Sequence, residues 1–145
     1  MLTFPRPLRA ASLIPLIAAL SLLPACGRSS SEAPPVPAAS DPEGKDLVDG
    51  AVVAALENSG GYRLYKIIHV EFLPAPLGQE LHMIAYDPKG TTFEDAARIW
   101  ARHEAKVLSA HILVNKVNFM TRDRRVLATE KVTDEERAPY LRSIR

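Results

Sequence analysis

Four histidines provide the side chains best suited to chemistry in this 145-residue sequence: His69, His82, His103 and His111. Imidazole is a common zinc ligand, yet none of the four stands in HExxH or in another spaced metal motif. The first two are expected on neighbouring strands, whereas the other two flank the predicted end of a helix. We therefore interpret them as surface or half-buried residues and predict no metal site and no cofactor. A small metal-assisted hydrolase that uses some of these histidines is the alternative.

Other arrangements that support hydrolysis are absent from the sequence. Ser59 and Ser109 do not lie in a GxSxG elbow, and no glycine-rich phosphate loop occurs. Glu94 and Asp95 are adjacent at the start of a predicted helix, where carboxylates favour the helix dipole and serve capping better than acid–base chemistry. The sequence therefore favours a protein that is not an enzyme.

Six basic residues in the second half of the chain form two groups. They are Arg98, Arg102 and Lys106, and Arg122, Arg124 and Arg125. The first group recurs every four residues along one face of a predicted helix, and the second crowds the tip of a predicted hairpin. Clustered basic side chains bind anions, so both groups are candidate binding residues for an acidic protein or polymer. The alternative is a solvated face whose charges pair with acids of the same domain.

Charge is distributed unevenly along the chain. Residues 41–96 contain ten acidic and four basic residues, whereas residues 97–145 contain eleven basic and six acidic ones. The formal net charge of +1 becomes −1 if Arg6 and Arg9 are removed with the N-terminal segment. A general nucleic-acid-binding protein is therefore not indicated.

The elements that must position these side chains are expected between residues 41 and 145. The apolar periodicity predicts a helix over residues 41–58, a hairpin of strands 62–73 and 81–87, and a helix over 91–107 that begins with Thr91 and Glu94 as a capping box. A second hairpin follows, with strands 109–120 and 124–132, and then a short helix that begins at Thr133. This order predicts an α+β fold, in which two helices cover one face of a four-stranded antiparallel sheet.

Residues 1–25 have the composition of a secretory signal peptide. Arg6 and Arg9 precede an apolar run from residue 10 to residue 23, and the small residue Ala25 stands before Cys26. The run is shorter than the roughly 20 apolar residues that span a bilayer. We therefore predict that this segment directs export and is removed.

The tetrapeptide Leu23-Pro24-Ala25-Cys26 resembles the lipobox of bacterial lipoproteins. The resemblance implies that the thiol of Cys26 is joined to diacylglycerol and that the mature chain begins at this residue. Gly27, in place of the aspartate that retains such proteins at the inner membrane, implies the outer membrane, with the protein facing the periplasm. Because Cys26 is the only cysteine, no disulfide is expected.

Residues 26–40 are rich in serine, alanine and proline and have no periodic apolar face, which predicts a linker. As an extended polyproline II segment, it could reach roughly 40 Å from the membrane. Residues 41–145 are long enough for one domain. The sequence thus predicts a lipid-anchored, non-catalytic module of the cell envelope. It would bind an envelope protein or an anionic envelope polymer, as an accessory subunit of a larger assembly.

Overall fold

The structure, a computed structural model, describes residues 40–145. The predicted signal peptide, the predicted lipidation site Cys26 and residues 27–39 of the predicted linker lie outside the described residues. The described elements, in chain order, are β1 (Ala51–Leu56), β2 (Tyr62–Phe72), β3 (Gln79–Gly90), α1 (Phe93–Ala101), β4 (Lys106–Asn115), α2 (Lys116–Met120), β5 (Arg124–Thr129) and α3 (Asp134–Ser143).

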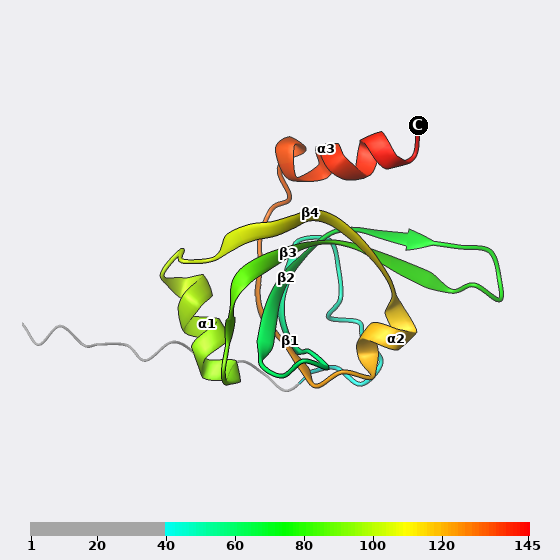
Figure 1. Ribbon diagram of the computed structural model, residues 1–145. Coiled ribbons are helices and arrows are strands. Elements are labelled where there is room, and N and C mark those ends of the chain that lie inside the picture. The colour runs from blue at the N-terminus through cyan, green and yellow to red at the C-terminus, as the bar shows by residue number, and fades with distance from the viewer. Residues whose placement is uncertain (1–39) are drawn as a thin grey trace, which may run out of the picture. The chain divides into compact units, whose positions relative to one another are not determined.

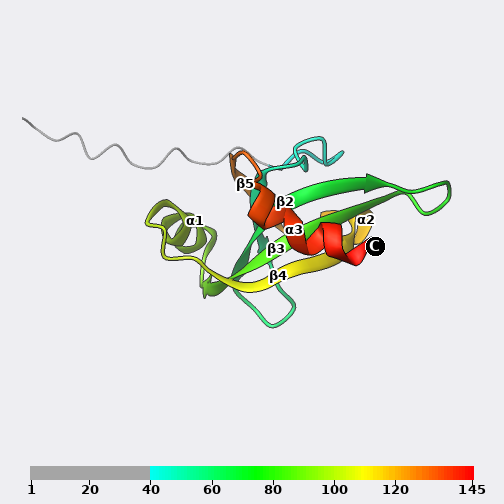
Figure 2. The same cartoon turned by 90° about the horizontal axis from the view of Figure 1, so that it is seen from above.

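The strands form one open antiparallel sheet with the order β4-β3-β2-β1-β5. The sheet is arched, with α3 above the arch and α2 beneath it (Figure 1), and α3 lies over the middle of the sheet when viewed from above (Figure 2). The predicted α+β class is confirmed. The predicted details differ, because the sheet has five strands rather than four and helices lie on both of its faces.

Each face of the sheet has its own apolar core. The core on the α2 side includes Phe119, which is fully buried and meets the ring of Tyr65 edge-on at 5.6 Å. The core on the other side is covered by α1, through Phe93 and Ile99, and by α3, through Tyr140. The two cores place α1 and α3 together on one face and α2 on the opposite face. Only one of the two helices predicted to share a face, α1, is therefore present there, and α3 takes the place of the other.

Residues 41–58, predicted as a helix, contain the first strand instead. β1 consists of six apolar residues, of which the first five are buried, and it lies between β2 and β5. A strand covered on both faces reads as a continuous apolar run, which periodicity alone does not separate from a buried helix. Gly50, directly before β1, has a φ of 86°, a left-handed conformation that is incompatible with the predicted helix.

The predicted hairpin over residues 62–87 is confirmed as β2 and β3. However, strict alternation along β2 would place Val70 and Phe72 on the face of Ile68, and a bulge between Ile67 and His69 breaks this alternation. His69 pairs with His82 after the bulge, and Val70 packs in the opposite core. A bulge re-aims the side chains that follow it. Here it turns His69 towards the face that α3 covers.

Helix α1 is shorter than predicted. Its N-cap is Thr92 rather than Thr91, and the Thr92 hydroxyl accepts the backbone N–H of Asp95 at 3.2 Å. The helix ends in a Schellman motif, in which His103 has a φ of 55° and the N–H of Glu104 donates to the carbonyl of Ile99 at 3.0 Å. Because histidine occupies a position that glycine usually takes, the sequence did not mark this end.

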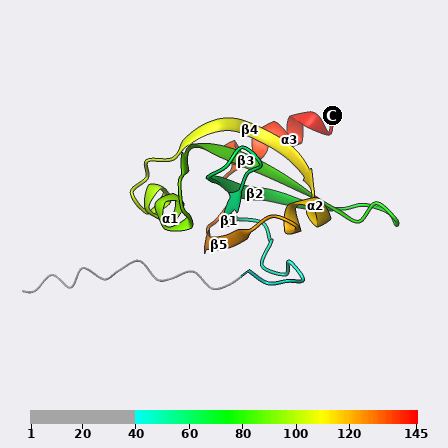
Figure 3. The same ribbon diagram turned by 60° about the horizontal axis from the view of Figure 1, so that its bottom comes forward.

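The second predicted hairpin is wrong. Asn115 caps α2 by accepting the backbone N–H groups of Val117 and Asn118, and α2 then leads the chain away from β4. β5 pairs with β1, so β4 and β5 lie at opposite edges of the sheet, as Figure 3 shows. Burial of Phe119 in the core fixes this crossing.

Helix α3 begins after Thr133, as predicted, and Thr133 forms a capping box with Glu136. At ten residues, the helix is longer than the short one expected. Pro139 lies inside the helix without ending it. Contacts with the sheet on both sides of this proline hold α3 in place, through Glu136 before it and Tyr140 after it. These tertiary contacts outweigh the cost of a proline in a helix.

Candidate functional site

Three of the four histidines converge on the sheet face beneath α3, contrary to the interpretation from the sequence. His69 and His82 are cross-strand partners on β2 and β3, and His111 reaches the same place from β4. Glu71 and Glu80 are also cross-strand partners, two positions further along the same strands. We call His69, His82 and His111 the histidine cluster.

His82 is the centre of this cluster and is only 3% exposed. Its Nε2 lies 2.9 Å from Glu71 Oε2, and its Nδ1 lies 2.9 Å from His111 Nε2. The planes of the two imidazole rings differ by 3°. These contacts form a hydrogen-bonded chain from the carboxylate through His82 to His111, in which each ring nitrogen of His82 has one partner.

Tyr140 of α3 covers the histidine cluster. Its ring centroid lies 4.4 Å from that of His82, 4.7 Å from that of His69 and 6.3 Å from that of His111. His69 also approaches a carboxylate, with 3.7 Å between its Nδ1 and Asp49 Oδ2. The aromatic ring of Tyr140 therefore covers the histidine cluster and partly shields it from solvent.

Burial lowers the pKa of His111, and the nearby charge of His82 when protonated lowers it further. The lowered pKa favours the neutral form of His111, in which one ring nitrogen can accept a hydrogen bond. Nearby, Lys66 is a buried cation whose Nζ donates to Glu136 Oε1 at 2.7 Å and to the Lys131 carbonyl at 3.3 Å. This lysine ties the start of α3 to β2.

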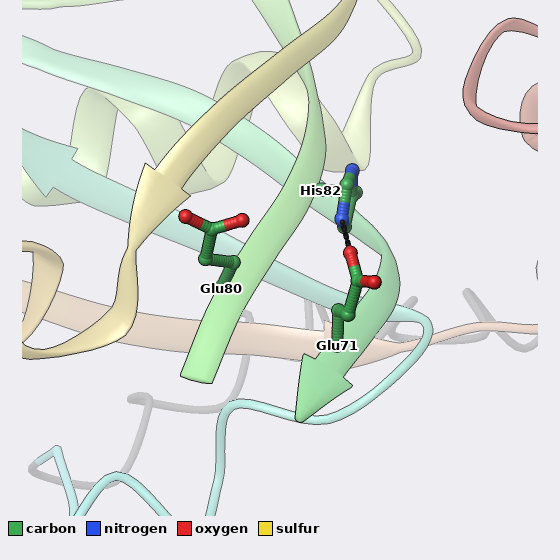
Figure 4. Close-up of side chains that lie close together, drawn as sticks. All are labelled: Glu71, Glu80 and His82. Carbon is green, nitrogen blue, oxygen red and sulfur yellow. Dashed lines mark hydrogen bonds and ion pairs between the residues drawn. The ribbon is translucent and has the colours of Figure 1, made fainter. Parts of the chain in front are cut away.

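Glu71, Glu80 and His82 each offer one ligand atom, and these three atoms lie within 4.8 Å of one another. Figure 4 shows the three side chains around the ends of β2 and β3, with Glu71 joined to His82 by its hydrogen bond. Two carboxylates and one imidazole are a donor set that first-row divalent metal ions accept. The sequence showed no sign of this group because its members come from two strands without motif spacing.

His103 does not belong to the cluster. It occupies the left-handed position that ends α1, where its N–H donates to the carbonyl of Trp100 at 2.9 Å. Its role in the described part of the chain is to end the helix.

The first basic group does not lie along one helix, because α1 ends at Ala101. Arg98 lies in α1 and pairs with Asp95, Arg102 is the C-cap, and Lys106 is the first residue of β4. The prediction of a single basic helix face is therefore wrong. Arg102 and Lys106 have no ion pair within residues 40–145, so their charges stay available to a partner.

The second basic group does not form a hairpin tip. Arg124 is 6% exposed and donates to the carbonyl of Asp41 at 2.8 Å. The guanidinium of Arg125 lies 4.5 Å from the ring centroid of Phe93, and that of Arg122 lies 5.7 Å from that of Phe119. These three arginines thus have partners inside the fold, and Arg124 in particular is a structural residue.

Strand β4 presents a feature that the sequence analysis missed. Among residues 40–145, it is an edge strand that pairs with β3 alone, and one side of its backbone has no neighbouring strand there. Val107, Leu108 and Leu113 are 58%, 54% and 51% exposed. Basic residues mark both ends, with Lys106 at the start and Lys116 directly after the strand. Natural edge strands are normally protected against pairing, which makes an apolar one a candidate docking site.

No protein-family model, curated protein or solved structure matches this chain. Within residues 40–145, the helices are all too short or too polar to cross a bilayer.

Proposed function

We propose that this protein is a lipid-anchored, non-catalytic module of the cell envelope that binds a partner protein along the edge of β4. The anchor is argued from the lipobox at residues 23–26 and the signal-peptide composition before it. The serine- and proline-rich composition of residues 26–40 supports a linker that would hold the domain in the aqueous space beside the membrane. The binding function rests on one observation, the unpaired edge of β4 with its exposed apolar side chains.

The chemistry of the edge specifies the partner segment. An extended segment can add to an open sheet edge through main-chain hydrogen bonds, while its side chains contact those of the edge strand. Val107, Leu108 and Leu113 favour apolar residues in that segment. Lys106 and Lys116 favour acidic residues at its two ends.

A protein partner is better supported than an anionic polymer. A polymer would require a continuous basic surface, whereas Arg98 is paired with Asp95 and Arg124 is buried. Arg122 and Arg125 lie over aromatic rings of the same domain. Of the six basic residues predicted to bind, Arg102 and Lys106 therefore remain the best candidates, because they lie at the approach to β4.

Site-specific photocrosslinking in intact cells tests this function. With the photoreactive residue at Leu108 or Leu113, we expect one discrete protein adduct. The control is Leu56 of β1, a leucine that is 38% exposed and lies away from the β4 edge. Absence of an adduct from β4, or the same adduct at equal yield from Leu56, would contradict the proposal.

Charge reversal refines the same experiment. Lys106→Glu combined with Lys116→Glu should reduce the Leu108 adduct at least threefold, because the partner's acidic ends are then repelled. Arg142→Glu combined with Arg145→Glu, at two exposed positions near the C-terminal end of the chain, is the charge-matched control and should leave the yield unchanged. An undiminished adduct in the Lys106/Lys116 variant would remove the acidic partner from the proposal.

A further inference from the structure

The paired positions of Glu71 and Glu80 place two carboxylates opposite each other on neighbouring strands. Like charges in this arrangement destabilise a sheet. Among the described residues, neither glutamate forms an ion pair with a lysine or arginine, and the one cation-forming partner of Glu71 is His82. In the described part of the chain, this face thus gathers negative charge beside an imidazole without an ion-paired lysine or arginine to balance it.

The orientation of His82 makes it suited to bind a cation there. If the hydrogen of the ring is on Nδ1, it donates to His111 Nε2, and the lone pair of Nε2 points towards Glu71 Oε2. Metal-binding histidines usually donate their second ring N–H to a fixed acceptor, which holds the ring in place. His111 is that acceptor in this site.

We propose that Glu71, Glu80 and His82 bind a divalent transition-metal ion, with zinc as the ion that fits best. Zinc bonds of about 2.0–2.2 Å to nitrogen and oxygen separate two ligand atoms in a tetrahedral site by about 3.4 Å. The present separation between Glu71 and His82 is 2.9 Å, and all three ligand atoms lie within 4.8 Å. Small rotations of the two glutamate side chains would bring the three ligand atoms to the spacing that a zinc ion requires.

The donor set distinguishes between metal ions. An imidazole nitrogen favours zinc over calcium or magnesium, which prefer oxygen ligands alone. The side chain of Glu71 is 37% exposed, so solvent reaches the site and water can occupy a fourth position. The bound ion would join the end of β2 to the start of β3 and balance the two carboxylates. This proposal replaces the expectation from the sequence that no metal site exists.

Calorimetric titration of the detergent-solubilised full chain with zinc chloride tests the site. The Cys26→Ser chain is used throughout, because any chain that has not received the proposed lipid would carry a free Cys26 thiol, which itself binds zinc. We expect one zinc per chain, at least tenfold weaker binding of manganese and no binding of magnesium. Failure to bind a stoichiometric zinc ion would overturn the proposal.

Glu80→Gln is the decisive variant. The side chain of Glu80 forms no hydrogen bond or ion pair within the described residues, so removal of its charge should leave the fold intact. We expect at least tenfold weaker zinc binding for Glu80→Gln and for Glu71→Gln. Two control variants change residues outside the site. Glu104→Gln removes an exposed carboxylate. His103→Asn removes a histidine and keeps the left-handed backbone at this position, which asparagine tolerates. Both controls should bind zinc as the parent does.

If zinc binds equally well to Glu80→Gln and Glu71→Gln, the ion lies elsewhere and this site is refuted. The same conclusion follows if either control variant abolishes zinc binding. The outcome is independent of the partner proposal. Photocrosslinking from β4 reports on binding at the sheet edge. The titration reports on zinc binding by Glu71, Glu80 and His82 of β2 and β3.

Discussion

At the residue scale, the buried ammonium of Lys66 explains how α3 stays on the sheet. Lys66 is a charged residue among the buried positions of β2, and its Nζ donates to Glu136 Oε1 at 2.7 Å. A buried cation is tolerated only when it is paired and hydrogen-bonded. The pair therefore links the start of α3 to the centre of the sheet.

The charge of Glu136 predicts a loss of stability in acid. Burial raises the pKa of Glu136, but hydrogen bonds from Lys66 and from Thr133 outweigh burial and hold the pKa below its ordinary value. A carboxylate with a lowered pKa in the folded state stabilises the fold above the unfolded-state pKa of about 4.3, and this contribution is lost as the pH falls below it.

Urea unfolding between about pH 5 and about pH 3 measures this effect. We expect the free energy of unfolding to fall with pH in the parent, and to fall less steeply in Glu136→Gln. At neutral pH, the same variant should lose about 2 kcal/mol, because Lys66 is left without its closest carboxylate. Glu135→Gln, next to it on α3 and without an ion pair, should keep the slope of the parent. Equal slopes in both variants would show that Glu136 does not stabilise the fold in this way.

At the element scale, β1 depends on the glycine that precedes it. The N–H of Gly50 donates to the carbonyl of Ile67 at 2.7 Å, and its carbonyl accepts the N–H of Glu130 at 2.9 Å. A Cβ at Gly50 would lie 2.0 Å from the carbonyl oxygen of Glu130. The chain therefore passes between its two neighbours only because this residue has no side chain.

Gly50→Ala should lower the free energy of unfolding by about 3 kcal/mol, through left-handed strain and through collision with the backbone of Glu130. Gly60→Ala is the matched control, because Gly60 has a similar φ of 82° but no atom within 4 Å of the added Cβ. It should lose only about 1 kcal/mol, from strain alone. Chemical denaturation of both variants gives the comparison. A loss in Gly50→Ala no larger than that in Gly60→Ala would show that the close approach does not matter.

At the scale of the whole molecule, the proposed anchor and the folded domain depend on different residues of the chain. Each buried methylene of an acyl chain contributes about 0.8 kcal/mol, so two or more chains hold a protein firmly at a membrane. The sequence contains one cysteine, Cys26, and it lies outside the described domain. Removal of this thiol should therefore affect the anchor alone.

Cys26→Ser should move the protein from the membrane fraction to the soluble fraction, whereas the parent stays with membranes after a high-salt wash. The thermal unfolding midpoint should be unchanged, because no cysteine lies within residues 40–145. Fractionation followed by N-terminal analysis measures both the location and the processing. Equal membrane association of the variant, or a mature chain that begins at another residue, would contradict the lipid anchor.

Local patterns were enough to predict some parts of this fold. The hairpin of β2 and β3, the helix that begins near Thr92 and the capping box of Thr133 and Glu136 each depend on residues close together in the sequence. Turn residues, alternation and capping groups act over a few positions, so the sequence shows them directly. The α+β class follows from these elements.

The remaining features depend on contacts between distant residues. The sequence alone did not separate a buried strand from a helix at residues 51–56, nor did it show that β5 pairs with β1 rather than with β4. The bulge that turns His69 towards α3 results from the pairing of β2 with β3.

The candidate site shows the same division. The sequence supplied its histidines, but His82 and His111 are 29 positions apart, and Lys66 and Glu136 are 70 positions apart. Which of these side chains meet depends on strand order and register, and both are set by how the two cores fill. The types of side chain were therefore determined by the sequence itself, whereas their convergence was decided only by tertiary packing, because burial and pairing act across the sheet rather than along the chain.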